Sequence, residues 1–196
     1  MPVNRTVPAG IVGILLAAGR GTRFGGDKLL AVLPDGECVG AAAARNLLAV
    51  LPEVVAVVRP DDAALAAALG ANGVRIVRCA NADDGMGASL ACAVRAWPGA
   101  AGWIVALADM PWIQPSTIAR VAGAVTGGAV VAAPFHGEAR GHPVGFGRSC
   151  YDALAALTGD EGAKSVVASH RDRIARIDVD DAGILRDIDT PADLPK

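Results

Sequence analysis

The chain has 196 residues, of which 53% are hydrophobic and 19% are charged, and its formal net charge is −2. This length suits a single domain over residues 1–196 with a substantial apolar core. The near-neutral balance gives no reason to expect a nucleic acid or an anionic membrane as a partner.

Targeting signals and a metal-binding cysteine motif are not expected. No uncharged apolar run reaches the roughly 18 residues that a spanning helix requires, and residues 1–10 lack the apolar core of a signal peptide. We therefore expect a cytoplasmic protein. The four cysteines are scattered and form no C-x-x-C pair, which predicts buried free thiols, at positions Cys38, Cys79, Cys92 and Cys150.

Apolar runs alternate along the chain with alanine- and leucine-rich stretches. Strands are expected at 11–16, 54–58, 74–77, 103–107, 129–133 and 174–179, with further extended pieces at 141–147 and 184–188. Helices are expected at 39–51, 63–69, 88–96, 114–125, 149–157 and 163–170. This alternation predicts an α/β fold: a three-layer, Rossmann-like sandwich with a mostly parallel sheet.

The first expected strand runs into a loop, residues 17–28, that holds four glycines, two arginines and one lysine. Glycine lets backbone N–H groups converge on an anion because it has no Cβ. Arg20, Arg23 and Lys28 add positive charge, so the loop suits a triphosphate. A glycine-rich turn with solvated charges is the alternative. No Gly-Lys-Ser/Thr closes a Walker A motif, and a dinucleotide fingerprint fits only loosely because Phe24 takes the third glycine position.

Other polar residues are expected at the same edge of the sheet. Arg59, the polar loop at 81–89 and Asp109 each follow an expected strand, and ligands of open α/β sheets bind beyond the carboxyl ends of the strands. Mg²⁺ with a nucleotide takes one or two carboxylates and phosphate oxygens, which a strand-end aspartate facing a phosphate loop can supply. The alternative for Asp109 is a cap of the turn with Pro111.

A second acidic segment lies near the end of the chain. Alternation puts Asp187 and Asp189 on the same face of an extended segment, and we expect Asp189 to lie beside Asp109 as a metal ligand. The alternative is a helix N-cap, with Thr190 or Asp189 ahead of Pro191 at the first helical position.

The stretch from Leu16 to Lys28 resembles L-A-[AG]-G-x-x-x-R-[MF]-G-x-x-K, the signature of the MobA-like nucleotidyltransferases. Its first four residues, Leu-Ala-Ala-Gly, are most similar to those of the molybdenum-cofactor cytidylyltransferases, the MocA-like group. Further segments extend the resemblance over most of the chain: residues 85–90 are similar to G-M-x-x-S-L, 109–111 to D-x-P, 141–143 to G-H-P, 160–164 to D-x-G-A-[RK], and 187–194 to [DN]-I-[DN]-T-P-x-D-L.

This resemblance implies a fold of the nucleotide-diphospho-sugar transferase type and a Mg²⁺-dependent transfer from CTP to molybdopterin. Ala18 stands where guanylyl relatives have glycine, which favours CTP. Implied catalytic residues are Arg23, Lys28 and Asp109, and implied Mg²⁺ ligands are Asp109 and Asp189. Implied substrate-binding residues are Leu16, Ala17, Ala18, Gly19, Arg20, Gly21, Arg23, Lys28, Gly87, Ser89 and His142.

In the expected reaction a phosphate oxygen of the acceptor attacks the α-phosphorus and pyrophosphate leaves, which needs positioning and charge neutralisation. Three alternatives remain open: GTP as donor, another phosphorylated acceptor, or a non-catalytic nucleotide- or cofactor-carrying chaperone. A molybdoenzyme or its chaperone is a further possible partner. Ser89 has plain helix capping as its alternative, and His142 a purely structural role. His136 and His170 receive no role.

Overall fold

The structure is a computed structural model, and it describes residues 10–21 and 24–195. Its strands are β1 Ile11–Leu16, β2 Val54–Val58, β3 Arg75–Arg78, β4 Gly102–Leu107, β5 Val131–His136, β6 Ala139–Arg140, β7 Val144–Gly147 and β8 Ile174–Asp178. Its α-helices are α1 Val39–Leu48, α2 Ala63–Ala71, α3 Met86–Ala96, α4 Pro115–Thr126, α5 Tyr151–Ala155 and α6 Lys164–Ser169.

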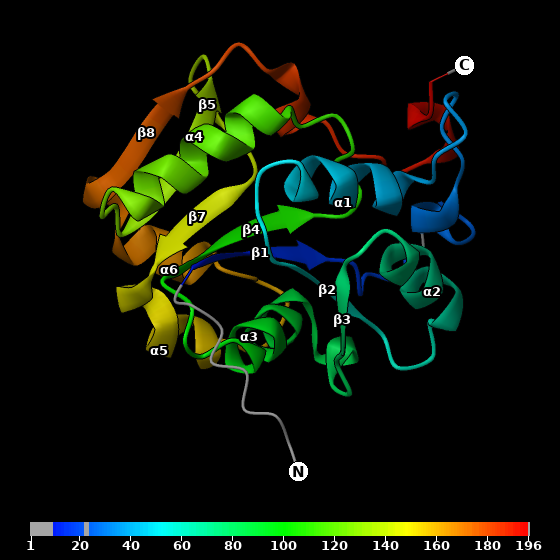
Figure 1. The fold of residues 1–196 in the computed structure, drawn as a ribbon, viewed down its shortest axis with the longest axis horizontal. Helices are drawn as coiled ribbons and strands as arrows, with labels where there is room; N and C mark the ends of the chain where they lie inside the picture. The colour runs from blue at the N-terminus through cyan, green and yellow to red at the C-terminus, as the bar shows by residue number, and fades with distance from the viewer. Residues whose placement is uncertain (1–9, 22–23, 196) are drawn as a thin grey trace.

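The strands form one mixed sheet in the order β3-β2-β1-β4-β7-β5-β6, with β8 pairing beside β5 (Figure 1). β1 lies parallel to β2 and β4, and β2 lies parallel to β3. β7 runs antiparallel between β4 and β5, whereas β8 runs parallel to β5. The mostly parallel α/β sheet is therefore confirmed, and the carboxyl ends of β1, β2, β3 and β4 meet at one edge.

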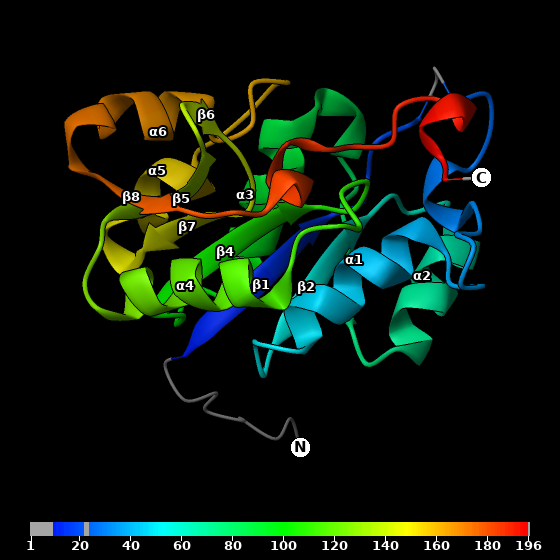
Figure 2. The same ribbon diagram turned by 90° about the horizontal axis from the view of Figure 1, so that it is seen from above.

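Helices cover both faces of the sheet, as Figure 2 shows from above. α1, α2 and α4 pack on one face, where Leu15 of β1 and Val54 of β2 point. α3, α5 and α6 pack on the other, against Ile14 and Val55. Neighbouring residues of a strand thus enter opposite cores, which explains why the central strands are apolar throughout. The three-layer arrangement predicted from the sequence follows from this two-sided burial.

Several predicted boundaries differ from the structure. Helix α3 begins at Met86, before the predicted start, because Gly85 adopts a φ of +113° and the helix starts directly after it. The prediction of an extended piece at 184–188 is wrong in its first half, where Ala182–Leu185 forms a 3₁₀ turn. That turn begins with a hydrogen bond from the Gly183 N–H to the Asp181 carboxylate, 3.0 Å long, which favours a turn over extended backbone.

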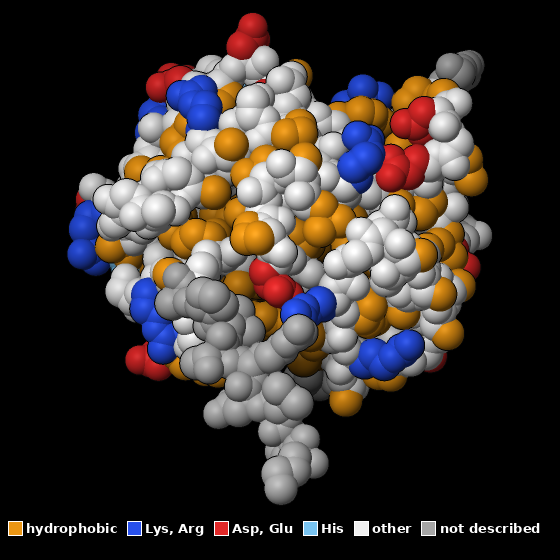
Figure 3. All heavy atoms as spheres, in the orientation of Figure 1, with side chains coloured by type: hydrophobic (Ala, Val, Ile, Leu, Met, Phe, Trp, Pro, Cys, Tyr) orange, Lys and Arg blue, Asp and Glu red, His pale blue; other side chains and the backbone are white. Residues whose placement is uncertain are grey.

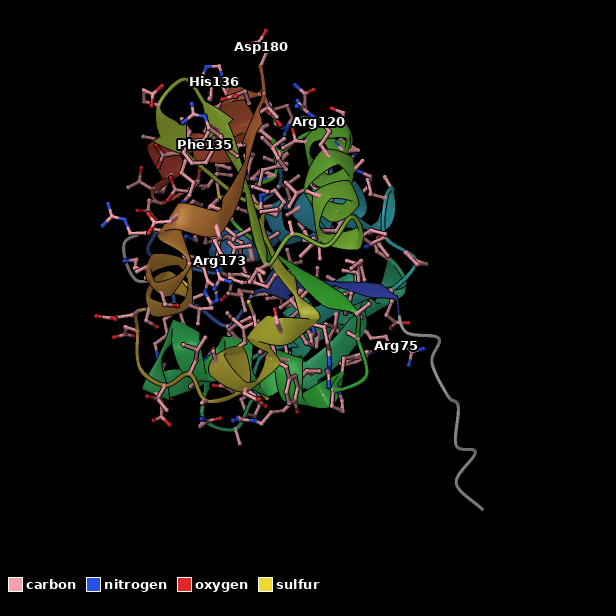
Figure 4. The ribbon with its side chains drawn as sticks, turned by 90° about the vertical axis from the view of Figure 1, so that its left-hand side faces the viewer. Arg75, Arg120, Phe135, His136, Arg173 and Asp180 are labelled. Carbon is pink, nitrogen blue, oxygen red and sulfur yellow. The ribbon has the colours of Figure 1, made fainter. Side chains whose placement is uncertain are left out.

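None of the helices among the described residues is long and apolar enough to cross a membrane. All four cysteines are free thiols, as predicted, but only Cys79 and Cys150 are buried, whereas Cys38 and Cys92 are half-buried. Burial raises the pKa of the Cys92 thiol to about 11. On the face drawn in Figure 3, basic and acidic side chains are interspersed and no broad area carries one sign of charge. Figure 4 shows His136 at the end of the molecule near Asp180, far from Arg75.

Candidate active site

A cavity of about 290 Å³ lies where the parallel strands end. The glycine-rich loop after β1, the start of α3 and Asp109, two residues after β4, all contribute to it. Its lining includes Leu16, Ala18, Gly19, Arg20, Gly21, Lys28, Arg59, Ala82, Asp83, Gly85, Met86, Ser89, Asp109 and Asp160. Most of the residues that the sequence analysis named as substrate-binding therefore lie together in this lining. Ala17, Gly87, His142 and Asp189 are not in this lining, and Arg23 lies outside the described residues.

Lys28 pairs with two acidic residues that are distant in the sequence. Its Nζ lies 2.7 Å from Asp109 Oδ2 and 3.5 Å from Asp189 Oδ1. The Lys28 and Asp109 side chains are only 13% and 21% exposed, so water screens this pair incompletely. The Ile188 N–H donates a 2.9 Å hydrogen bond to the Asp109 carbonyl oxygen, which holds the C-terminal acidic segment beside β4.

Asp109, Asp187 and Asp189 form a possible metal-binding cluster. One carboxylate oxygen from each lies within 4.8 Å of those of the other two. Asp109 Oδ1 is buried and has no hydrogen-bond partner among the described residues, and a cation is one group that would satisfy it. The sequence analysis placed Asp187 and Asp189 on one face and chose only Asp189; the structure brings both to Asp109.

The N-cap alternative for this segment is fulfilled by Thr190. It precedes the 3₁₀ turn Pro191–Asp193 and forms a capping box with Asp193. Hydrogen bonds from the backbone and hydroxyl of Thr190, and from the backbone of Asp189, lower the pKa of the Asp193 carboxyl. Thr190, and not Asp189, is thus the N-cap, while the Asp189 carboxylate lies 3.5 Å from Lys28 Nζ.

A second ionic cluster at the cavity was not anticipated from the sequence. Arg20 Nη2 lies 2.8 Å from Asp83 Oδ2 and 2.9 Å from Oδ1, while Arg59 Nη1 lies 2.6 Å from Oδ1. The hydrogen bonds from Arg59, and then from Arg20, lower the pKa of Asp83 to about 2. This cluster ties the glycine-rich loop to the ends of β2 and β3. The sequence analysis placed Arg59 and the 81–89 loop, which contains Asp83, at this edge of the sheet. No local pattern indicated that these side chains form ion pairs.

The first turn of α3 faces the cavity. Ser89 is 4% exposed and lines the cavity, but the N-cap residue is Gly85 and no side chain of the described residues caps the helix. The capping alternative for Ser89 is therefore wrong. Gly87 packs against the 158–159 backbone, and its N–H donates to the Gly159 carbonyl oxygen. A contact of Gly87 or Ser89 with substrate stays a prediction.

His142 lies just before β7 and is close enough to Asp109 and Asp187 for their charges to act on it. Burial lowers the pKa of His142, more strongly than these two carboxylates raise it. Its Nδ1 is buried without a hydrogen-bond partner among the described residues. A contact between His142 and a second substrate remains a prediction.

Two buried polar residues that the sequence analysis missed hold the loops near this edge. Asn46 of α1 donates from Nδ2 to the Pro111 carbonyl oxygen at 2.8 Å, which fixes the loop after Asp109. Asp181 accepts hydrogen bonds from the Gln114 N–H and the Thr117 hydroxyl at the start of α4. Both positions read as ordinary polar residues within or beside a helix or turn, so no local pattern marked them.

A larger cavity of about 630 Å³ lies at the opposite, amino-terminal ends of the strands. It is lined by apolar residues such as Ile11, Pro52 and Trp97, together with the Glu53–Arg75 ion pair at 2.5 Å. The lining has neither the glycine-rich loop nor the acidic cluster. We therefore take the smaller cavity as the candidate active site because of the residues that line it, although its volume is smaller.

Fold and site together are those of a nucleotide-binding α/β protein. Residues 13–174 match the MobA-like NTP transferase domain. The match covers most of the chain, so the protein belongs to the MobA-like NTP transferase family, a family of nucleotidyltransferases with a fold of the nucleotide-diphospho-sugar transferase type. The resemblance stated from the sequence is confirmed at this level.

Three relatives illustrate the family. The purine catabolism protein PucB of Bacillus subtilis (strain 168) is 32% identical over 92% of both chains, and the nicotine blue oxidoreductase of Paenarthrobacter nicotinovorans is 29% identical over 92% of both. The crystal structure of Rv0371c from Mycobacterium tuberculosis H37Rv is 29% identical, with a TM-score of 0.80 over 93% of this chain and 94% of that one. A complex of Rv0371c with manganese has a TM-score of 0.77 at 29% identity, covering 93% and 95%.

Proposed function

We propose that this protein transfers CMP from CTP to the phosphate of a molybdopterin-type acceptor and releases pyrophosphate, with Mg²⁺ as cofactor. The observation that supports this most is the position of Lys28 between Asp109 and Asp189, beside the glycine-rich loop. An ammonium group can neutralise phosphate oxygens, and the neighbouring carboxylates can hold a divalent cation. A single small region thus supplies both kinds of charge that a triphosphate reaction needs.

The donor set fits Mg²⁺. Carboxylate oxygens are the hard ligands that this ion prefers, and the unpartnered Asp109 Oδ1 offers one of them. We assign Asp109 and Asp189 as the residues that would hold the ion, with Asp187 within reach. When bound, Mg²⁺ would neutralise phosphate charge and make the α-phosphorus more electrophilic. The manganese complex of Rv0371c supports a divalent cation in this family.

The nucleotide is assigned to the loop after β1. Leu16, Ala17, Ala18, Gly19 and Gly21 would present backbone to the nucleotide, while Arg20, Lys28 and Arg23 would neutralise its charge. Gly87 and Ser89 would contact it from α3. A methyl group on Ala18 narrows the cavity beside the base, which favours a pyrimidine by about 1–3 kcal/mol at most, so the preference for CTP over GTP can be partial.

The acceptor is assigned to the side of Asp109 on which His142 lies. Because burial favours the neutral imidazole, His142 would orient a phosphorylated acceptor by hydrogen bonding, without adding charge. Molybdopterin as the acceptor, and a molybdoenzyme or its chaperone as the recipient of the product, rest on the resemblance of the L-A-A-G and G-H-P segments to the MocA-like group.

The test is turnover of the Asp109→Asn variant, measured as Mg²⁺-dependent pyrophosphate release from CTP in the presence of a molybdopterin source. We expect the variant to keep its fold and to lose at least about 100-fold in rate, the scale of removing a charge-stabilising element. Asp152→Asn makes the same chemical change at an exposed position on α5 and should keep full activity. A folded Asp109→Asn variant with full activity would remove the metal assignment.

A further inference from the structure

The turn at residues 158–162 packs against the first turn of α3, where that helix faces the cavity. The Gly87 N–H donates to the Gly159 carbonyl oxygen at 2.7 Å. A Cβ on Gly85 would overlap the Asp160 carboxylate, and a Cβ on Gly87 would lie 2.5 Å from the Thr158 carbonyl oxygen. The two glycines therefore allow the turn to approach closely, and Asp160 becomes part of the cavity lining.

Asp160 differs from the other carboxylates of this lining. Asp83 is bound by two guanidinium groups, and Asp109 by the Lys28 ammonium. The Asp160 carboxylate makes no hydrogen bond or ion pair within the part of the chain that the structure describes. An ionised carboxylate accepts hydrogen bonds and donates none. Asp160 therefore offers the cavity an acceptor that no group of the described residues uses.

A nucleoside triphosphate has phosphates, a ribose and a base to place in this cavity. A carboxylate repels phosphates. The glycine backbone at Gly21 and the ammonium of Lys28, both in the loop after β1, suit the negative phosphates better. The cavity also has apolar lining, including Ala18, Ala82 and Met86, which suits the faces of a flat base. An acceptor beside apolar groups is the arrangement that fixes the orientation of such a ligand.

We infer that Asp160 accepts a hydrogen bond from the amino edge of the base, so that the site selects cytosine over uracil. This inference rests on the proposed function. Cytosine carries an N4 amino donor at the position where uracil carries a carbonyl oxygen, so the same carboxylate attracts one base and repels the other. Guanine also presents N–H donors on one edge, and GTP is therefore tested separately.

The experiment is titration calorimetry of CTP, UTP and GTP with Mg²⁺, for the unmodified chain and for Asp160→Asn. We expect the unmodified chain to bind CTP at least about 10-fold more tightly than UTP, the scale of one hydrogen bond to a charged group. Asp160→Asn should remove most of this ratio, because an amide can donate to the uracil oxygen. Glu161→Gln loses the same charge in the same turn, at an exposed residue outside the cavity lining, and should leave the ratio unchanged.

The outcomes separate this inference from the function on which it rests. If Asp160→Asn does not change the ratio of CTP affinity to UTP affinity, the inference alone is overturned. An equal loss of affinity for both nucleotides is one such result, and it would indicate a contact with the ribose. A loss confined to GTP overturns the assignment of cytosine. If none of the three triphosphates binds the unmodified chain, the proposed function fails together with the inference.

Discussion

Replacing Lys28 by methionine should destabilise the protein and make its stability depend on divalent cations. Methionine keeps an unbranched side chain of similar length and removes the ammonium that lies 2.7 Å from Asp109 and 3.5 Å from Asp189. The carboxylates of Asp109, Asp187 and Asp189 would then lie within 4.8 Å of one another without this counter-charge.

The size of the effect follows from Coulomb's law. Two unit charges 4.8 Å apart repel each other by about 3 to 4 kcal/mol at an effective dielectric constant of about 20. Asp187 is exposed and the side chain of Asp189 is 42% exposed, so water and side-chain rotation weaken this repulsion. We therefore expect Lys28→Met to lower the free energy of unfolding by about 2 kcal/mol at neutral pH.

Urea unfolding followed by tryptophan fluorescence measures this change, first at low ionic strength with EDTA and then with millimolar Mg²⁺. Most of the lost stability should return with Mg²⁺, because the cation replaces the missing charge and binds only the folded state. Lys164→Met is the matched control: Lys164 is exposed at the start of α6, and its replacement should change stability by less than about 0.5 kcal/mol.

Two results would refute this reasoning. If Lys28→Met unfolds at the same urea concentration as the unmodified chain in EDTA, the three carboxylates do not repel one another as the distances imply. If the variant is destabilised but Mg²⁺ restores nothing, the acidic cluster does not bind the ion, and the metal assignment of Asp109 and Asp189 fails without any measurement of activity.

The remaining expectations concern the nucleotide and glycines in α3 and α4. Mg²⁺ should tighten CTP binding by about tenfold or more, measured by calorimetry with and without EDTA. Labelled pyrophosphate should exchange into CTP once the dinucleotide product is present. Metal-independent binding together with no exchange would favour a non-catalytic cofactor-carrying chaperone. Gly87→Ala should lower the free energy of unfolding by about 1–3 kcal/mol, because its Cβ would lie 2.5 Å from the Thr158 carbonyl oxygen. Gly123→Ala in α4 should instead raise it by about 0.5–1 kcal/mol, because nothing lies within 4 Å of that Cβ; equal effects in urea unfolding would contradict both.

Much of the architecture was predictable from local sequence. Val54–Val58 is a continuous apolar run, and it forms a central strand buried along its whole length. Gln114 and Pro115 predicted the start of a helix, and α4 begins at that proline. Patterns of this kind reflect burial and backbone preference within a few residues, which a sequence displays directly. The order of strands and helices along the chain, and the edge of the sheet at which the candidate site lies, follow from them.

Tertiary structure decided how the charged groups are combined. Lys28 and Asp109 are 81 positions apart, and Arg20 and Asp83 are 63 apart. Sequence indicated that Lys28 and Asp109 belong to one edge of the sheet, but not that they form an ion pair. It placed the 81–89 loop at the same edge, but did not indicate that Asp83 of this loop pairs with Arg20. The register of β1 against β4 and the turn after β3 set these distances, and neither has a local signature.

The same holds for the residues that complete the cavity. Asp187 joins the acidic cluster because the Ile188 N–H bonds to the backbone of Asp109, and Asp160 reaches the lining because Gly85 and Gly87 leave room for its turn. The sequence by itself thus determined which kinds of residue stand at the ends of which strands, since periodicity and turn chemistry are local. Which of them touch was decided only by folding, because contacts between distant segments depend on packing across the whole sheet.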